Sequence, residues 1–133
     1  MAKLVTLHDA DGEVIYPQTI SDMDYSTSEQ DTGCKWIDGK KIYKKTVFFK
    51  SVASGDVNSA HGISNVSLVI KHEAFFISSG TYVTVPSLVN TNGGNYFSIW
   101  SINSTNVRTF SSTPFQDFYV TIWYTKTTDS QQG

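Results

Sequence analysis

The sequence predicts an all-β protein, an antiparallel β-sandwich of jelly-roll-like type, on three observations. Aromatic residues make up 14% of the chain, and together with many β-branched and small polar residues this composition is typical of strands. Turn signals separate about eight short strand patterns, at the spacing usual in sandwiches. No amphipathic helix pattern extends beyond a turn or two. A chain of 133 residues has room for one core.

The N-terminal part differs from the rest and predicts a short hairpin followed by an acidic connector. Strand patterns at 4–7 and 13–17 flank a turn signal, and a polar, acidic stretch without periodicity follows. The predicted parts of the chain are the hairpin and connector at 1–31, the sandwich head domain at 32–128 and a frayed tail at 129–133.

In the main body, Asp38-Gly39 is a strong hairpin turn pair. Residues 54–64 contain two glycines and no apolar period, which predicts a loop or a single helical turn, and Asp56 is interpreted there as a turn residue. Residues 90–95 predict another loop. The segments with strand patterns are 34–37, 42–50, 66–77, 81–85, 96–102, 105–110 and 118–126.

The last strand pattern has two apolar faces. Alternate residues from Phe118 to Tyr124 form a core face, whereas Tyr119 and Trp123 lie on the opposite face among threonines. A strand with one wet face seldom needs two large aromatics there, so we expect an oligomer whose subunits pack through sheet faces. Tyr119, Trp123 and Trp100 are the candidate interface residues. The alternative is that they are scattered surface aromatics.

No pattern for catalysis, a cofactor or a metal site is found. His8, His61 and His72 lie far apart, and Cys34 is the only thiol and shows no pairing with a histidine. Gly93-Gly94 is followed by neither a helix nor a lysine, as a phosphate loop would require. Most aspartates stand in turn contexts, which argues against the paired carboxylates of a glycosidase. We therefore expect a non-enzymatic protein.

Charge and hydropathy narrow the choice of partners. The formal net charge is −2 and the lysines form no basic groove, so the aromatics are not expected to serve nucleic-acid binding. No apolar run is long enough for membrane insertion, and the N-terminus does not resemble a signal peptide. We expect synthesis in a reducing cytoplasm.

Binding through loops is the remaining interpretation. The segments 90–95, 103–106 and 111–117 are rich in Asn, Ser, Gly, Thr and Tyr, a composition that suits polar, uncharged ligands such as sugars. Arg108, the only arginine, lies between the last two of these segments; its alternative role is that of an ordinary exposed strand residue. The candidate receptor-binding residues are Asn92, Asn95, Asn103 and Arg108.

Three segments carry a family resemblance. Residues 29–47 contain a pattern similar to TGxxWIDGKxIYxKT, residues 118–129 one similar to YVTxxYTKTTD, and residues 7–19 one similar to DxxGxxIYPxT. These patterns resemble the opening, the close and the preceding segment of head domains in tail-fibre and receptor-binding proteins of tailed bacteriophages and prophages. The likeness is loose between Ser51 and Ser112.

The resemblance implies a β-sandwich head, often a homotrimer, on the virion tail, made in the bacterial host cytoplasm. It implies recognition of a host cell-surface molecule, commonly a glycan, in other cases a protein. Residues 1–31 would contact other tail proteins. The motif residues expected to be architectural are Thr32, Gly33, Trp36, Asp38, Gly39 and Tyr43.

Two alternatives to adhesion stay open. The opening pattern also occurs in other phage structural proteins, so the chain could be a tail or baseplate accessory protein that serves assembly alone. A depolymerase acting on a surface polysaccharide is the other alternative, and the lack of paired carboxylates argues against it.

Overall fold

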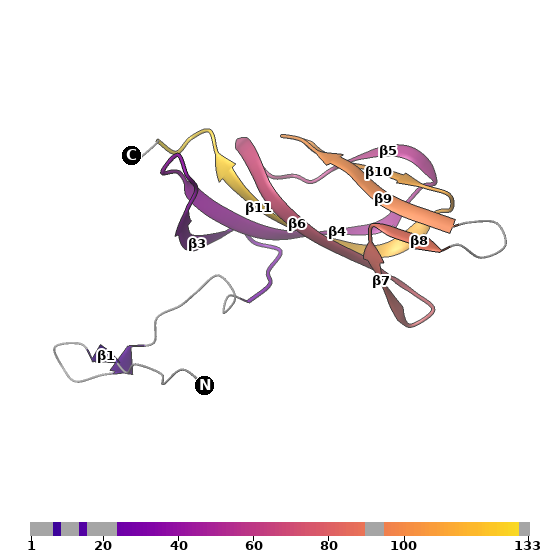
Figure 1. The fold of residues 1–133 in the computed structure, drawn as a ribbon, viewed down its shortest axis with the longest axis horizontal. Coiled ribbons are helices and arrows are strands. Elements are labelled where there is room, and N and C mark those ends of the chain that lie inside the picture. The colour runs from indigo at the N-terminus through magenta and orange to yellow at the C-terminus, as the bar shows by residue number, and fades with distance from the viewer. Residues whose placement is uncertain (1–6, 9–13, 16–23, 90–94, 131–133) are drawn as a thin grey trace.

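The computed structural model describes residues 7–8, 14–15, 24–89 and 95–130, and it confirms the predicted antiparallel all-β sandwich. No helix occurs in these residues. Their strands form a two-stranded, a five-stranded and a four-stranded sheet, and the last two are the layers of the sandwich (Figure 1). The hairpin predicted near the N-terminus is the smallest sheet, in which β1 (Leu7–His8) pairs with β2 (Val14–Ile15).

The five-stranded sheet, called here the large sheet, has its longest strands in the middle. Its order is β3-β4-β11-β6-β7, and every neighbouring pair is antiparallel. The strands are β3 (Gln30–Lys35), β4 (Lys41–Val52), β11 (Phe115–Lys126), β6 (Val66–Ser78) and β7 (Thr81–Val85). Since β11 lies between β4 and β6, the two segments of the family resemblance that include β3–β4 and β11 are neighbours in space.

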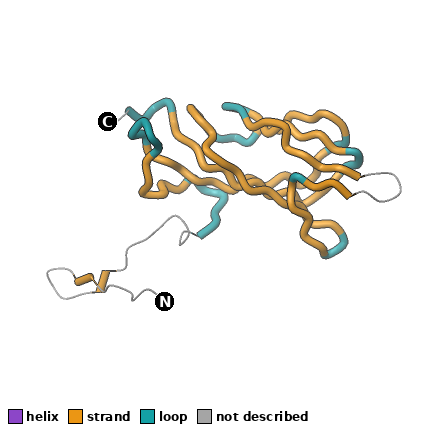
Figure 2. The backbone as a smooth tube through the Cα atoms, in the orientation of Figure 1, coloured by secondary structure: helices purple, strands orange, loops and turns teal. Residues whose placement is uncertain are grey.

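The four-stranded sheet, called here the small sheet, packs over part of the large one (Figure 1). Its order is β5-β10-β9-β8. The strands are β5 (Gly55–Ala60), β10 (Asn106–Ser111), β9 (Asn95–Ile102) and β8 (Ser87–Val89). The connections among the described residues are mostly short, and strands account for most of the trace (Figure 2).

The core lies between the two sheets. The predicted core face of β11 is confirmed, because Phe118, Val120, Ile122 and Tyr124 are almost completely buried. Ring contacts join the layers: the Phe76 ring on β6 lies 4.6 Å from that of Phe97 on β9, measured between centroids. Burial of such large apolar side chains supplies most of the stabilisation of a small domain, about 1.5–3 kcal/mol for each.

The hairpin between β3 and β4 follows from local turn chemistry. Asp38 accepts a hydrogen bond from the Lys40 N–H (2.9 Å), and Gly39 has a φ of 86°, a conformation that a side chain disfavours. The Gly39 N–H donates to the Trp36 carbonyl oxygen (2.9 Å) and closes the turn. The predicted Asp-Gly hairpin is thus confirmed.

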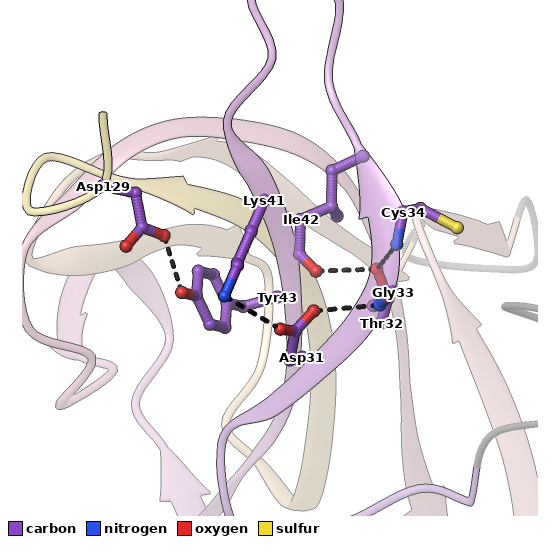
Figure 3. Close-up of polar contacts among 8 residues, drawn as sticks. All are labelled: Asp31, Thr32, Gly33, Cys34, Lys41, Ile42, Tyr43 and Asp129. Carbon is purple, nitrogen blue, oxygen red and sulfur yellow. Dashed lines mark hydrogen bonds and ion pairs between the residues drawn. The ribbon is translucent and has the colours of Figure 1, made fainter. Parts of the chain in front are cut away.

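The strands beside this turn are joined by polar side chains (Figure 3). The Thr32 hydroxyl donates to the Ile42 carbonyl oxygen (2.7 Å) across the β3–β4 pair, and Asp31 lies between Lys41 and the Gly33 N–H. The Tyr43 hydroxyl donates to Asp129 just beyond β11 (2.6 Å). These contacts connect the opening and closing segments of the chain's sandwich.

The predicted loop at 54–64 is wrong in part, because residues 55–60 form β5. This segment is rich in Gly, Asp, Asn and Ser, which have low strand propensity. It is a strand because its backbone pairs in full register with β10, from Asn106↔Ala60 to Ser111↔Gly55. The short strand β8 was also missed, and β3, β4 and β11 begin earlier than expected.

Candidate functional site

The outer face of the small sheet carries a shallow hollow of about 480 Å³, called here the Trp100 groove. Asp56, Ser98, Ile99, Trp100 and Phe110 line it, and Arg108 lies beside it. Its volume is within the range of small-ligand sites. Three strands contribute: β5 supplies Asp56, β9 supplies residues 98–100, and the central strand β10 supplies Arg108 and Phe110.

A β-bulge positions Trp100. Along the β9–β10 pair, Arg108 is opposite Ser101 whereas Thr109 is opposite Ile99, so Trp100 is the extra residue on β9. A bulge of this kind changes the direction of a side chain. The Trp100 side chain is 64% exposed although it is large and apolar, which makes it available to a ligand.

Arg108 connects the indole to a carboxylate. Its Nε and one Nη donate to the two carboxylate oxygens of Asp56 at 2.8 and 2.5 Å, and its Cζ lies 3.8 Å from the centre of the Trp100 ring. The hydrogen bond from Arg108 lowers the pKa of Asp56 and raises that of the guanidinium, so both groups stay ionised at neutral pH. Their side chains are 35% and 40% exposed, and ion pairs so accessible contribute little to stability. The pair therefore acts mainly by fixing the orientation of its groups.

The other predicted receptor-binding residues do not join Arg108 in the groove. Asn103 lies in the β9–β10 turn, where its side-chain oxygen accepts from the N–H groups of Thr105 (2.9 Å) and Asn106 (2.7 Å) and shapes the turn. Asn95 is exposed at the start of β9, and its side-chain oxygen lies 3.5 Å from the Ser112 hydroxyl. Asn92 lies outside the described residues.

The three candidate interface residues lie on both layers. Trp100 is on the outer face of the small sheet, whereas Tyr119 and Trp123 are on the outer face of the large sheet, on β11. Trp123 is only 3% exposed within a single chain. The ammonium groups of Lys71 and Lys44 lie 4.1 and 5.7 Å from the centre of its ring.

The segment just before β3 covers the outer face of the large sheet beside Trp123. The Tyr25 ring lies 3.8 Å from the Lys44 ammonium, and its hydroxyl donates to Glu73 on β6 (3.0 Å). The Thr46 N–H on β4 donates to the Ser26 carbonyl oxygen (2.9 Å), which fixes the segment against the sheet. Residues that the sequence places in a connector are thus part of the packed domain.

Tyr119 belongs to a line of aromatic side chains across four strands, called here the aromatic row: Phe48, Tyr119, Phe75 and Tyr82. The successive ring centroids are 4.8, 5.2 and 5.8 Å apart. Phe48, Phe75 and Tyr82 are exposed, Tyr82 to 71%. Sequence reasoning missed these three, although Phe48 shares the strand face of Lys44 and Thr46 and would have followed from the β4 alternation.

His61 and Cys34, two residues considered for chemistry in the sequence, can both be placed in the structure. His61 is buried, and its Nδ1 accepts the Ile63 N–H (3.0 Å), so its Nε2 carries the proton and donates to the Asn103 carbonyl oxygen (2.9 Å). Cys34 is a free thiol on β3. Within the described ranges, no group of three or more His, Cys, Asp or Glu side chains is placed to hold a metal ion. The same residues contain no helix able to span a membrane.

Comparison with known proteins gave no match to a protein family, to a curated protein or to a solved structure.

Proposed function

We propose that this chain is a non-enzymatic head domain of a phage tail fibre or receptor-binding protein, located on the virion, and that it binds a host-surface glycan through the Trp100 groove. One observation carries the binding site. At the edge of a ligand-sized hollow, an exposed indole stacks against Arg108, and Arg108 makes two parallel hydrogen bonds to the Asp56 carboxylate. An apolar surface with a few fixed polar groups is the usual composition of a small-ligand site.

The chemistry of a sugar matches these groups. A sugar ring has a face of C–H bonds, which packs against an aromatic ring, and an edge of hydroxyls, which needs both donors and acceptors. A guanidinium has five N–H donors, and the two hydrogen bonds to Asp56 use two of them. The Asp56 carboxylate has lone pairs beyond those that accept from Arg108. The pair can therefore donate and accept at neighbouring hydroxyls.

The phage assignment is supported by the family resemblance of the opening and closing segments. The groove residues fall between Ser51 and Ser112, where that resemblance is loose. Receptor-contacting surfaces are expected to vary among adhesins of different specificity, whereas the framework that carries them is expected to be kept. The separation of framework segments from groove residues fits this expectation.

The test is binding of the purified chain to host cells and to an array of bacterial surface glycans. Trp100→Ala is expected to weaken binding by about 30-fold or more, the loss typical of a central aromatic contact. Ile37→Ala removes an even more exposed apolar side chain, which belongs neither to the groove nor to the aromatic row, and serves as the control, with unchanged binding expected. Absence of both cell and glycan binding in the wild-type chain would end the adhesion proposal.

A second candidate function, a structural or assembly protein of the tail, is favoured by the aromatic row. Exposed apolar patches of neighbouring rings commonly mark protein interfaces. If three copies associate through this row, the mass in solution is three times 14.8 kDa, and weak glycan sites gain avidity. Residues 1–31 would contact other tail proteins in either case.

Light scattering after size exclusion separates these functions. Phe75→Ser combined with Tyr82→Ser is expected to reduce the oligomer to monomers, whereas Trp100→Ala leaves the mass unchanged. A stable oligomer that binds neither cells nor glycans would favour the structural function.

A further inference from the structure

We propose that the Trp100 groove selects neutral glycans and rejects acidic ones, because Asp56 already occupies the carboxylate-binding side of Arg108. This inference rests on the glycan-binding function proposed above and names the class of ligand.

The small sheet has a balanced and very sparse charge. Its four strands contain two charged residues, Asp56 and Arg108, and these two neutralise each other. The turn at 103–105 and the segment at 112–114 contain no charged residue either. A ligand at the groove therefore meets an indole, a phenyl ring, hydroxyls and one closed ion pair, with no net charge to attract an anion.

The geometry of the pair decides which ligand it admits. The two parallel N–H···O bonds are the arrangement in which arginine binds a carboxylate or a phosphate. A uronate, a sialate or a sugar phosphate could take this position only by displacing Asp56, and it would leave that carboxylate close to its own negative charge. Like charges at such distances repel.

A neutral hydroxyl has no such conflict. It can donate to Asp56 or accept from an unused N–H of Arg108 while the two hydrogen bonds between Arg108 and Asp56 stay intact. The stacked position of Arg108 over Trp100 is then kept, and the indole remains oriented for the sugar ring. The same pair that excludes acidic sugars thus preserves the surface that neutral sugars use.

The experiment measures the full chain on an array of bacterial polysaccharides that includes neutral, uronate-bearing and phosphate-bearing members. All strong binders of the wild-type chain are expected to be neutral. Asp56→Asn frees the positive charge of Arg108, and we expect the affinity for acidic members relative to neutral ones to rise about tenfold. The gained binding is expected to fall as salt concentration rises.

Glu73→Gln is the charge-matched control, because it changes the net charge equally on the opposite layer and keeps an acceptor for Tyr25. Circular dichroism and thermal unfolding verify that the variants fold. We expect Asp56→Asn to fold, because an ion pair as exposed as that of Asp56 and Arg108 contributes little to stability.

Each outcome is decisive. Preference of the wild-type chain for acidic glycans overturns this inference and leaves the glycan-binding function standing. Binding of neutral glycans with a preference that Asp56→Asn does not alter also overturns it, because the ion pair would then not set the selectivity. If neither host cells nor any glycan is bound, the proposed function fails, and the inference with it.

Discussion

Two threonines on the outer face of the large sheet offer a sharp test of the packing. Thr46 on β4 and Thr121 on β11 are directly opposite each other, and their hydroxyl oxygens are 2.8 Å apart. They are 9% and 5% exposed, between the covered Trp123 and the aromatic row. Each hydroxyl therefore depends on the other for its hydrogen bond.

Valine is the appropriate substitution, because it keeps the β-branched shape and the strand propensity and removes the hydroxyl. Either single change leaves one hydroxyl without its partner, which costs about 1 kcal/mol, the lower end of the usual range because slight exposure remains. The double change removes donor and acceptor together and is expected to be neutral to within ~0.5 kcal/mol. The coupling free energy between the two sites is then ~2 kcal/mol.

Urea unfolding followed by tryptophan fluorescence measures these free energies, provided that the dependence on denaturant concentration is the same for all variants. Thermal unfolding should show losses of roughly 4 °C for each single variant. Thr84→Val, an exposed threonine on β7 of the same sheet, is the control and should change stability by less than ~0.5 kcal/mol. Destabilisation of the double variant by the sum of the single effects would refute the mutual hydrogen bond.

Three further changes test other parts of the fold. Thr125→Val should raise the free energy of unfolding by about 1 kcal/mol in urea, because the Thr125 hydroxyl is fully buried and has no hydrogen-bond partner among the described residues; a loss would show that it has one. Gly39→Ala should lower the free energy of unfolding by about 1 kcal/mol or more, because φ is 86° at this position; an unchanged free energy would contradict the turn. The hydrogen bond to Asp129 raises the pKa of Tyr43 to about 12, and burial followed by the bond to Glu29 raises that of Tyr124. The folded protein therefore retains these phenol protons, and the stability that they give is present below pH 10. The contribution of Tyr43 is lost as the pH rises from 10 to about 12, whereas that of Tyr124 begins to fall at the same pH and persists to higher pH. Ultraviolet titration should show a group of tyrosines that ionise only above pH 10, and this group should be smaller in Tyr124→Phe. Ionisation of all tyrosines together near pH 10 would refute the raised pKa values.

The features that sequence predicts well are those with local causes. The alternation along 118–126 identified the core face of β11, because period-two patterns reflect which face a strand buries. The Asp38-Gly39 turn likewise followed from its own two residues. The burial of Trp123 was not predicted, because the lysines over its ring come from β4 and β6, strands paired with β11 but distant in sequence.

The groove shows why a site is harder to predict than a strand. Arg108 and Trp100 were both noted in the sequence, but as candidates for different roles, and Asp56 was interpreted as a turn residue. The bulge on β9 and the pairing of β5 with β10 bring the three together. Asp56 and Arg108 are 52 residues apart in the chain, and no local pattern records their pairing.

The position of β11 has a consequence for how the protein is made. The ribosome synthesises the chain from its N-terminus, so β4 and β6 emerge long before the strand that fills the space between them. Until residues 115–126 leave the exit tunnel, both strands present open hydrogen-bonding edges and apolar faces, which favour aggregation. The large sheet can close only after synthesis of β11, and a nascent chain that stops before Phe115 is expected to be insoluble or to require a chaperone.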